Sequence, residues 1–150
     1  MIIKKVTIKE YQKPFISEVF LGKSIFSVRK GWYIKIYNED SFGIGEAAPI
    51  PNISVENHNE VGYALEGFSI ALEGIDYKIS IEELLLLSDV HGYKKPSAKF
   101  AIQSAIYDLS SKLENIPLNK YLNKNAKNSI MINYYTDSLV NPFEGMVVKL

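Results

Sequence analysis

The chain has 150 residues, 47% of them hydrophobic, which suits one packed domain with a fragment of a second. Its 17 acidic residues balance 17 basic ones, and the basic residues form no stripe along the sequence, which argues against a nucleic-acid partner. The lack of cysteine excludes disulfides and thiolate chemistry, and two histidines are too few for a multi-histidine zinc site. No apolar run approaches the roughly 18 residues of a membrane span, and the N-terminus lacks the apolar segment of a signal peptide, so we expect a cytoplasmic protein without membrane contact.

Alternating side chains predict three strands near the N-terminus. Apolar residues alternate with lysines over residues 2–9, and a second alternation runs through residues 32–37. Turn residues at 38–41 separate this strand from a third, which begins at Phe42. Residues 14–30 show no clear period, so we expect a long loop after the first strand of a three-stranded antiparallel sheet.

The apolar period then becomes helical. Ser80 is predicted to cap a short helix that runs through Leu87, Pro96 opens a longer helix, and residues 117–122 make one further turn. The preceding helix is predicted to be capped by Ser54, with an apolar face at Val61, Ala64, Leu65, Phe68, Ala71 and Leu72. Because the strands precede the helices instead of alternating with them, the pattern predicts an α+β domain whose helices cover one face of the sheet.

A polar linker at residues 123–128 indicates a domain boundary. Beyond it, an apolar run at 130–134 predicts a buried strand, and Pro142 after an asparagine predicts the start of a helix. We therefore divide the chain into a domain of residues 1–125 and the beginning of a second at 126–150. A lone strand and an incomplete helix cannot bury their own apolar faces, so another domain or another chain is expected to cover them.

Two segments of the first domain resemble the enolase superfamily. Residues 31–54, GWYIKIYNEDSFGIGEAAPIPNIS, resemble the second and third strands of its N-terminal capping domain, where a signature ends the hairpin at Gly43, Gly45, Glu46 and Pro49. Residues 95–122, KPSAKFAIQSAIYDLSSKLENIPLNKYL, resemble its long helix and the short element after it, through Ala101, Ala105, Asp108, Pro117, Leu118 and Leu122. The resemblance implies an enolase N-terminal-like capping domain.

The third resemblance lies at the C-terminal end. Residues 132–147, INYYTDSLVNPFEGMV, resemble the first strand and the opening of the first helix of the family's (β/α) barrel, so the chain would hold a truncated start of that barrel. Within the superfamily the muconate-lactonizing subgroup fits best, and o-succinylbenzoate synthases are the most similar. Their pattern often has Asn-Gly-Leu where this chain has Asn133, Tyr134 and Tyr135.

The resemblance implies Mg²⁺-dependent proton abstraction α to the carboxylate of a small substrate, here a dehydration in menaquinone biosynthesis. The family's lysine bases and metal carboxylates lie on barrel strands that would follow residue 150. It therefore implies no catalytic residue and no metal ligand in this chain, which we expect to be inactive alone, with Mg²⁺ needed only by the full-length enzyme. The alternatives are a dipeptide epimerase or muconate cycloisomerase, or a non-catalytic truncated protein or interaction module.

The capping role implies which residues could contact substrate. In the family two capping-domain loops close over the barrel mouth, and here they correspond to residues 20–28 and 50–54. Apolar walls would come from Phe20, Phe26 and Ile53, and a substrate carboxylate would meet Lys23 or Ser24. The full set of candidates is Phe20, Lys23, Ser24, Phe26, Ile53, Ser54, Tyr135 and Thr136, each of which could instead be solvated or packed against the sheet or beneath the cap.

Three other residues have simpler interpretations. Lys149 could begin the lysine-bearing second barrel strand, but it follows Pro142 so closely that we expect it on the first barrel helix. Glu46 is expected to make structural hydrogen bonds in the hairpin, although its place beside the signature glycines also suits an acid near a site. His58 is expected to be a solvated residue in the first turn of its helix.

Overall fold

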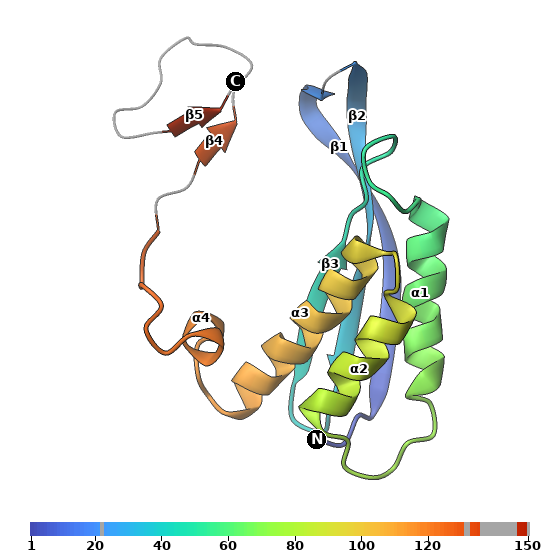
Figure 1. Cartoon of the computed structure of the whole chain (residues 1–150), viewed down its shortest axis with the longest axis vertical. Coiled ribbons are helices and arrows are strands. Elements are labelled where there is room, and N and C mark those ends of the chain that lie inside the picture. Colours follow the sequence, from blue (N-terminus) through green and yellow to red (C-terminus); the bar gives the residue numbers. More distant parts are fainter. Residues whose placement is uncertain (22, 131–132, 136–146, 150) are drawn as a thin grey trace.

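The computed structural model describes residues 1–21, 23–130, 133–135 and 147–149. Its three-stranded antiparallel sheet has the order β1 (Lys5–Leu21), β2 (Ser24–Tyr37) and β3 (Phe42–Ala47). The helices that follow are α1 (His58–Ala71), α2 (Ile81–His91), α3 (Pro96–Leu113) and α4 (Leu118–Leu122) (Figure 1). The predicted α+β class is confirmed. None of the described helices has both the length and the apolar character needed to cross a membrane.

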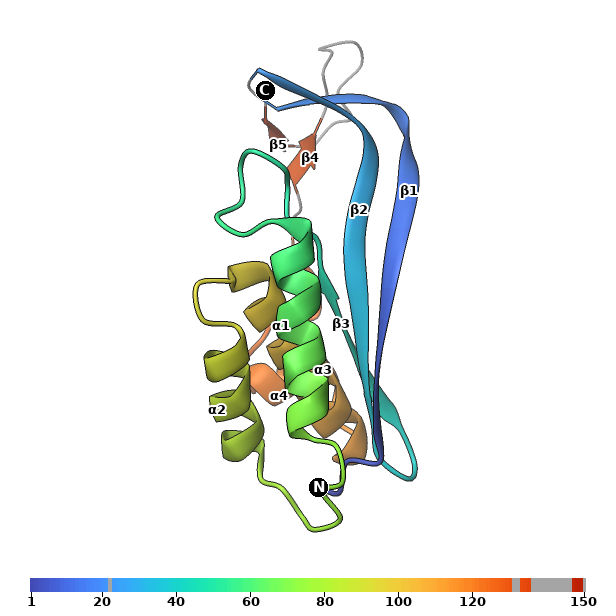
Figure 2. The ribbon, with the colours of Figure 1, turned by 90° about the vertical axis from the view of Figure 1, so that its right-hand side faces the viewer.

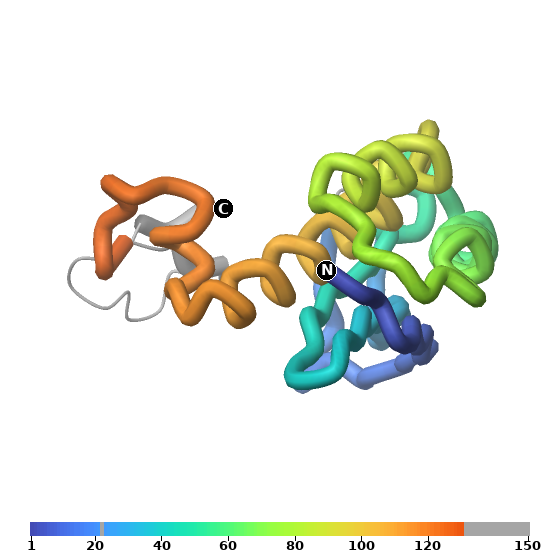
Figure 3. The backbone as a smooth tube through the Cα atoms, turned by 90° about the horizontal axis from the view of Figure 1, so that it is seen from below, coloured from blue at the N-terminus to red at the C-terminus, as the bar shows by residue number. Residues whose placement is uncertain are grey.

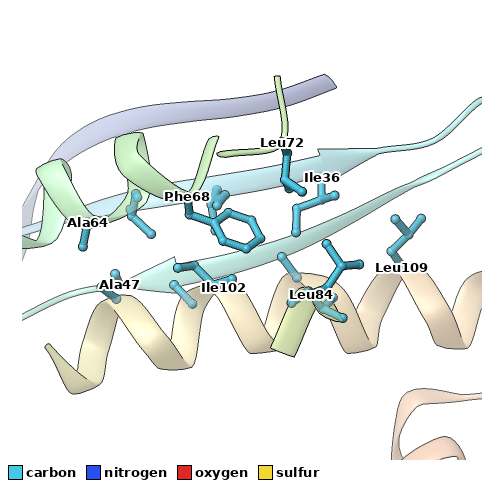
Figure 4. Packing of buried hydrophobic residues seen from close by; sticks show 14 of the residues in the cluster. Ile36, Ala47, Ala64, Phe68, Leu72, Leu84, Ile102 and Leu109 are labelled. Atoms are coloured by element: carbon cyan, nitrogen blue, oxygen red, sulfur yellow. The ribbon is translucent and has the colours of Figure 1, made fainter. Parts of the chain in front are cut away.

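The helices cover a single face of the sheet, as the edge-on view shows (Figure 2). Seen from below, sheet and helices form two layers, and the chain leaves them through the far end of α3 (Figure 3). Alternate residues of each strand point into the space between the layers: Ile34 and Ile36 of β2 are fully buried, as is Ala47 of β3. They meet side chains from α1, α2 and α3 that include Phe68, Leu84, Ile102 and Leu109 (Figure 4).

The contact between β3 and α3 depends on two glycines of the signature. A Cβ atom on Gly43 would lie 1.9 Å from the carbonyl oxygen of Ala105, and one on Gly45 would lie 1.9 Å from that of Ala101. No side chain fits at either position, so the helix backbone packs directly on the strand. The alanines on the facing side of α3 are small for the same reason, which gives the family signature a physical basis.

The other side of β3 is the edge of the sheet, and polar side chains of α3 bind its backbone. Asp108 accepts a hydrogen bond from the Ile44 amide at 2.9 Å, and Lys112 donates one to the Phe42 carbonyl at 2.9 Å. These two side chains also form an i,i+4 ion pair at 2.7 Å. The helix therefore satisfies backbone groups that an exposed edge strand would leave open.

One helix start is predicted correctly and another is not. Ser80 caps α2 in a capping box with Glu83, as expected. The cap of α1, however, is Asn57, which forms a capping box with Glu60, and Ser54 instead accepts a hydrogen bond from the Ile50 amide at 2.8 Å. The prediction for Ser54 was wrong because several capping side chains stand close together before the helix, and periodicity does not choose among them.

The N-terminus of α3 is capped from a distance. Its own N-cap residue, Lys95, makes no side-chain cap, but Glu56 accepts hydrogen bonds from the Ser97 hydroxyl and from the Ser97 amide, the latter at 2.8 Å. Burial by itself would raise the pKa of this carboxyl, which is only 5% exposed, but the hydrogen bonds from Ser97, with a further one from the Glu56 backbone, outweigh it and lower the pKa. A negative charge at this helix end is also favoured by the helix dipole.

Residues 14–30 are not the loop that the sequence predicts. β1 and β2 continue through them as a two-stranded ribbon that extends beyond the end of β3 and past the helices (Figure 2). The register shifts between Pro14 and Val19, where β1 advances five positions while β2 advances two. This bulge interrupts the alternation of side chains, which explains why the segment shows no period in the sequence.

The C-terminal segment forms two short parallel strands, β4 (Asn133–Tyr135) and β5 (Val147–Lys149). A strand at 133–135 agrees with the predicted apolar strand at 130–134, with a shift in its bounds. Lys149 lies in β5, so its expected place on a helix is wrong, and parallel pairing with β4 is the arrangement that a (β/α) barrel requires of its strands. The helix start predicted at Pro142 lies outside the described residues.

Replacing Gly45 by alanine tests the contact between α3 and β3. We expect G45A to lower the free energy of unfolding by about 3 kcal/mol, because the new methyl group can fit only if the helix moves away from the strand. Urea unfolding followed by circular dichroism measures the change. I44A, on the outward face of the same strand, should cost less than about 1 kcal/mol, and an equal loss in both variants would contradict the account.

Replacing Glu56 by glutamine tests the distant cap of α3. Because the folded protein lowers the pKa of Glu56, its ionised form contributes stability above the ordinary value of 4.5, and this contribution is lost as the pH falls through the lowered value. We expect E56Q to be about 1–2 kcal/mol less stable than wild type at pH 7, with the difference shrinking below pH 4.5. E66Q, at an exposed position of α1, is the control, and a pH-independent effect of E56Q would argue against the cap.

Candidate functional site

A hollow of about 410 Å³ lies between the β1–β2 ribbon and the segment that follows β3. Its walls are mainly apolar, with two cationic side chains among them: Phe15, Val19, Leu21, Phe26, Val28, Arg29, Lys30, Pro49, Ile50 and Pro51. A concave, mainly apolar surface with a few charged or polar groups is typical of sites for small molecules. A larger hollow, of about 570 Å³, lies at the other end of the sheet, beside the start of β1 and the end of α1, and it contains none of the predicted site residues.

The bulge in β1 produces the apolar wall on the ribbon. The bulge inserts three extra residues into β1. Because this number is odd, the side chains of β1 beyond the bulge exchange the two faces of the ribbon relative to the alternation before it. As a result Val19 pairs with Phe26, and both line the hollow together with Leu21. The ribbon turns over toward the helix side of the sheet, above the loop that follows β3 (Figure 2).

The opposite wall is a short, internally bonded loop. The Ile53 and Ser54 amides both donate to the Ile50 carbonyl, at 3.1 and 2.9 Å, and the Ser54 hydroxyl accepts from the Ile50 amide. Asn52 has a positive φ of 64°, a conformation that asparagine tolerates better than most residues. Together with the prolines at positions 49 and 51, these bonds hold the loop in one shape.

Two side-chain hydrogen bonds tie β1 and β2 to β3 and to the residue that follows it. Arg29 of β2 donates from Nη2 to the Ala48 carbonyl at 2.5 Å, and Tyr11 of β1 donates from its hydroxyl to Glu46 Oε1 on β3. Burial, followed by the hydrogen bond to Glu46 and its charge, raises the pKa of Tyr11 well above its ordinary value, so the hydroxyl keeps its proton. The structural hydrogen bonding expected of Glu46 is confirmed.

The predicted site residues fall into different places. Phe26 lines the hollow, and Ser54 lines a neighbouring hollow of about 490 Å³ that shares Lys30 with the first. Phe20 pairs with Ile25, one position out of step with the wall residues, and Ile53 is 55% exposed. Lys23 is exposed at the ribbon turn and Ser24 is half-buried beside it.

The last two candidates lie in the C-terminal segment. Tyr135 ends β4, and Thr136 is outside the described residues. The ends of β4 and β5 are at the same end of the molecule's long axis as the ribbon tip (Figures 1 and 2). None of the eight assignments is tested by this placement, and all remain predictions.

Arg29 is the main residue lining the hollow that the sequence did not single out. Its position within a supposed loop gave no reason to single it out, whereas its alternation with Gly31 and Tyr33 along β2 would have placed it on the outer face. His58 was also misjudged, since it is half-buried, pairs with Glu10 at 2.8 Å and stacks on the Trp32 ring. Neither contact could be foreseen without the partner strand.

Within the described residues, no three histidine, aspartate or glutamate side chains lie close enough together to hold a metal ion. The charged groups at the hollow are Arg29 and Lys30, which would attract an anion.

Similar solved structures share this fold. A dipeptide epimerase from Cytophaga hutchinsonii is 22% identical, with a TM-score of 0.78 over 90% of this chain and 37% of its own. An N-succinyl Arg/Lys racemase from Bacillus cereus ATCC 14579 is 19% identical, with a TM-score of 0.77 over 90% and 37%. A mandelate racemase/muconate lactonizing protein from Herpetosiphon aurantiacus is 18% identical, with a TM-score of 0.73 over 91% and 38%. The chain thus spans little more than a third of the length of these structures.

No curated protein matches the chain in sequence. A family model does: the N-terminal domain of MenC, o-succinylbenzoate synthase, matches residues 3–109, which is most of the chain and includes the sheet and the first three helices nearly to the end of α3. Together with the superfamily fold of the solved structures, this match decides the family. The chain belongs to the MenC N-terminal domain family of the enolase superfamily.

Proposed function

We propose that this chain is the substrate-capping portion of an o-succinylbenzoate synthase-like enzyme. The reaction would be a dehydration in menaquinone biosynthesis that begins with proton abstraction α to a carboxylate, with Mg²⁺ as a cofactor of the whole enzyme. The observation that carries the proposal is the apolar hollow with Arg29 and Lys30 among its walls, on a chain that belongs to the MenC N-terminal family. We also propose a cytoplasmic location for it.

The part assigned to this chain is binding and exclusion of water. The apolar walls on the ribbon, such as Phe26 and Val28, would cover the apolar part of a substrate, and the cations would favour its carboxylate. Removing water strengthens electrostatic interactions at the reacting atoms, which would be held by a barrel domain or by another chain beside β4 and β5.

Two other functions remain as candidates. Dipeptide epimerases are among the similar structures, and an epimerase or a muconate cycloisomerase would use the same hollow for a different carboxylate. A non-catalytic product of 150 residues is the third candidate. The intact mass of the native protein distinguishes it, because a barrel of about 250 residues would at least double the 17.0 kDa of this chain.

The 150-residue chain alone is expected to show no dehydration, epimerisation or cycloisomerisation. The family's base and metal carboxylates lie on barrel strands, and the described residues offer no metal site. Incubation of the purified chain with each substrate and Mg²⁺, followed by chromatography of the products, measures this. Turnover that a chelator abolishes would contradict the expectation.

Replacing Phe26 by alanine tests the hollow in the native gene product. We expect F26A to raise KM for the substrate that forms o-succinylbenzoate about five- to thirtyfold, with kcat nearly unchanged, because it removes apolar contact made equally in the ground and transition states. F100A, on the outer side of α3 where the side chain is 66% exposed, is the matched control and should leave KM within about twofold. Equal effects of both variants, or none of F26A, would count against the assignment. An epimerase would instead convert a dipeptide and show the same dependence on Phe26.

A further inference from the structure

The β1–β2 ribbon loses the support of the third strand at its base. β3 pairs only with residues 32–37 of β2, so residues 24–31 of β2 pair with β1 alone. A two-stranded ribbon is only marginally stable in water, and neither face of this one is covered by a helix (Figure 2). Something at its base must therefore fix the direction in which it projects.

Tyr11 crosses the sheet at this base. It pairs with Gly31, the first residue of β2 beyond the end of β3, and a Cβ atom on Gly31 would lie 2.6 Å from the Tyr11 hydroxyl oxygen and 2.7 Å from two of its ring carbons. The ring therefore lies flat over the glycine and passes across β2 to reach Glu46 on β3. The Tyr11 ring also stacks on Tyr33, with ring centroids 4.6 Å apart and planes at 24°.

Arg29 adds a second tie at the same level. Its guanidinium donates to the Ala48 carbonyl, the first residue after β3 and the start of the loop that forms the other wall of the hollow. Its positive charge is also near enough to the Tyr11 hydroxyl to oppose the rise in that pKa. The hydrogen bonds of Tyr11 and Arg29 thus connect all three strands where the sheet narrows to two.

We infer that Tyr11, Gly31, Glu46 and Arg29 form a latch that sets the position of the ribbon over the loop of residues 48–56. Tyr11, Gly31 and Glu46 are positioning residues because they lie outside the hollow, whereas Arg29 both lines the hollow and bonds to the loop. The role of Glu46 in the signature is then to accept the hydrogen bond that the Tyr11 hydroxyl donates across the sheet. The effect of the latch on substrate binding rests on the proposed function, whereas its effect on the position of the ribbon does not.

Hydrogen–deuterium exchange on the 150-residue chain tests the latch without any substrate. Y11F removes the hydroxyl and keeps the ring, whereas G31A keeps the hydroxyl and displaces the ring. Both should speed exchange of backbone amides in residues 15–28 about threefold to tenfold and leave those of α3 unchanged. Y33F, which keeps the ring stack and the bond to Glu46, is the matched control and should match wild type.

Two variants of Glu46 separate a hydrogen bond from general packing. E46Q retains an oxygen that can accept from Tyr11 and should exchange slowly, as wild type does, whereas E46A should behave like Y11F. Unchanged exchange in Y11F and G31A would overturn the latch. Equal acceleration in the ribbon and in α3 would also overturn it, because that result indicates a loss of global stability.

The native gene product tests the consequence for substrate. Y11F and E46A should raise KM about threefold to tenfold with kcat nearly unchanged, and E46Q should restore KM. Faster ribbon exchange with an unaltered KM would overturn the positioning role. If no carboxylate substrate is converted at all, the proposed function fails, while the exchange experiment still decides whether the latch holds the ribbon.

Discussion

The α3 backbone rests directly on two glycines of β3, and the rest of the structure depends on this contact. With Gly43 and Gly45 in place, strand and helix approach until the carbonyls of α3 occupy the space where side chains would be. This close approach brings Asp108 and Lys112 to the edge of β3, where they bind its backbone. The sheet therefore needs no fourth strand on that side, and α1 and α2 can fill the remainder of the same face.

Because the helices stop short of the ribbon, the molecule has two parts that are stabilised in different ways. The covered part buries a continuous core and gains its stability from packing. The ribbon and the loop after β3 gain little from burial and are held by individual hydrogen bonds, those of Arg29, Ser54 and Glu56 among them. Glu56 matters to both parts, since it ends the loop and caps the helix that carries the core.

The sequence predicted the covered part well because burial on one face imposes a period. Helices at α1, α2 and α3 follow from that period, as do the strands around Trp32 and Phe42. The ribbon was missed because a bulge breaks its alternation after Pro14, and the caps were confused because Ser54 and Asn57 are both capping residues and only tertiary bonds distinguish them. The hollow depends on the ribbon, so Phe26 was named as a candidate from family resemblance alone and Arg29 was not named at all.

Under the proposed function, a hollow between a ribbon and a loop would allow related caps to accept different substrates. Its shape follows from side chains on two short segments, whereas the position of those segments follows from Tyr11, Gly31 and Glu46, which do not line it. Wall residues can therefore change without moving the walls, and the base can stay fixed while the substrate differs. This separation is compatible with a fold that this chain shares with a solved epimerase and a solved racemase at only about 20% identity, and under the proposed function it would put selectivity in the side chains of the ribbon and the loop.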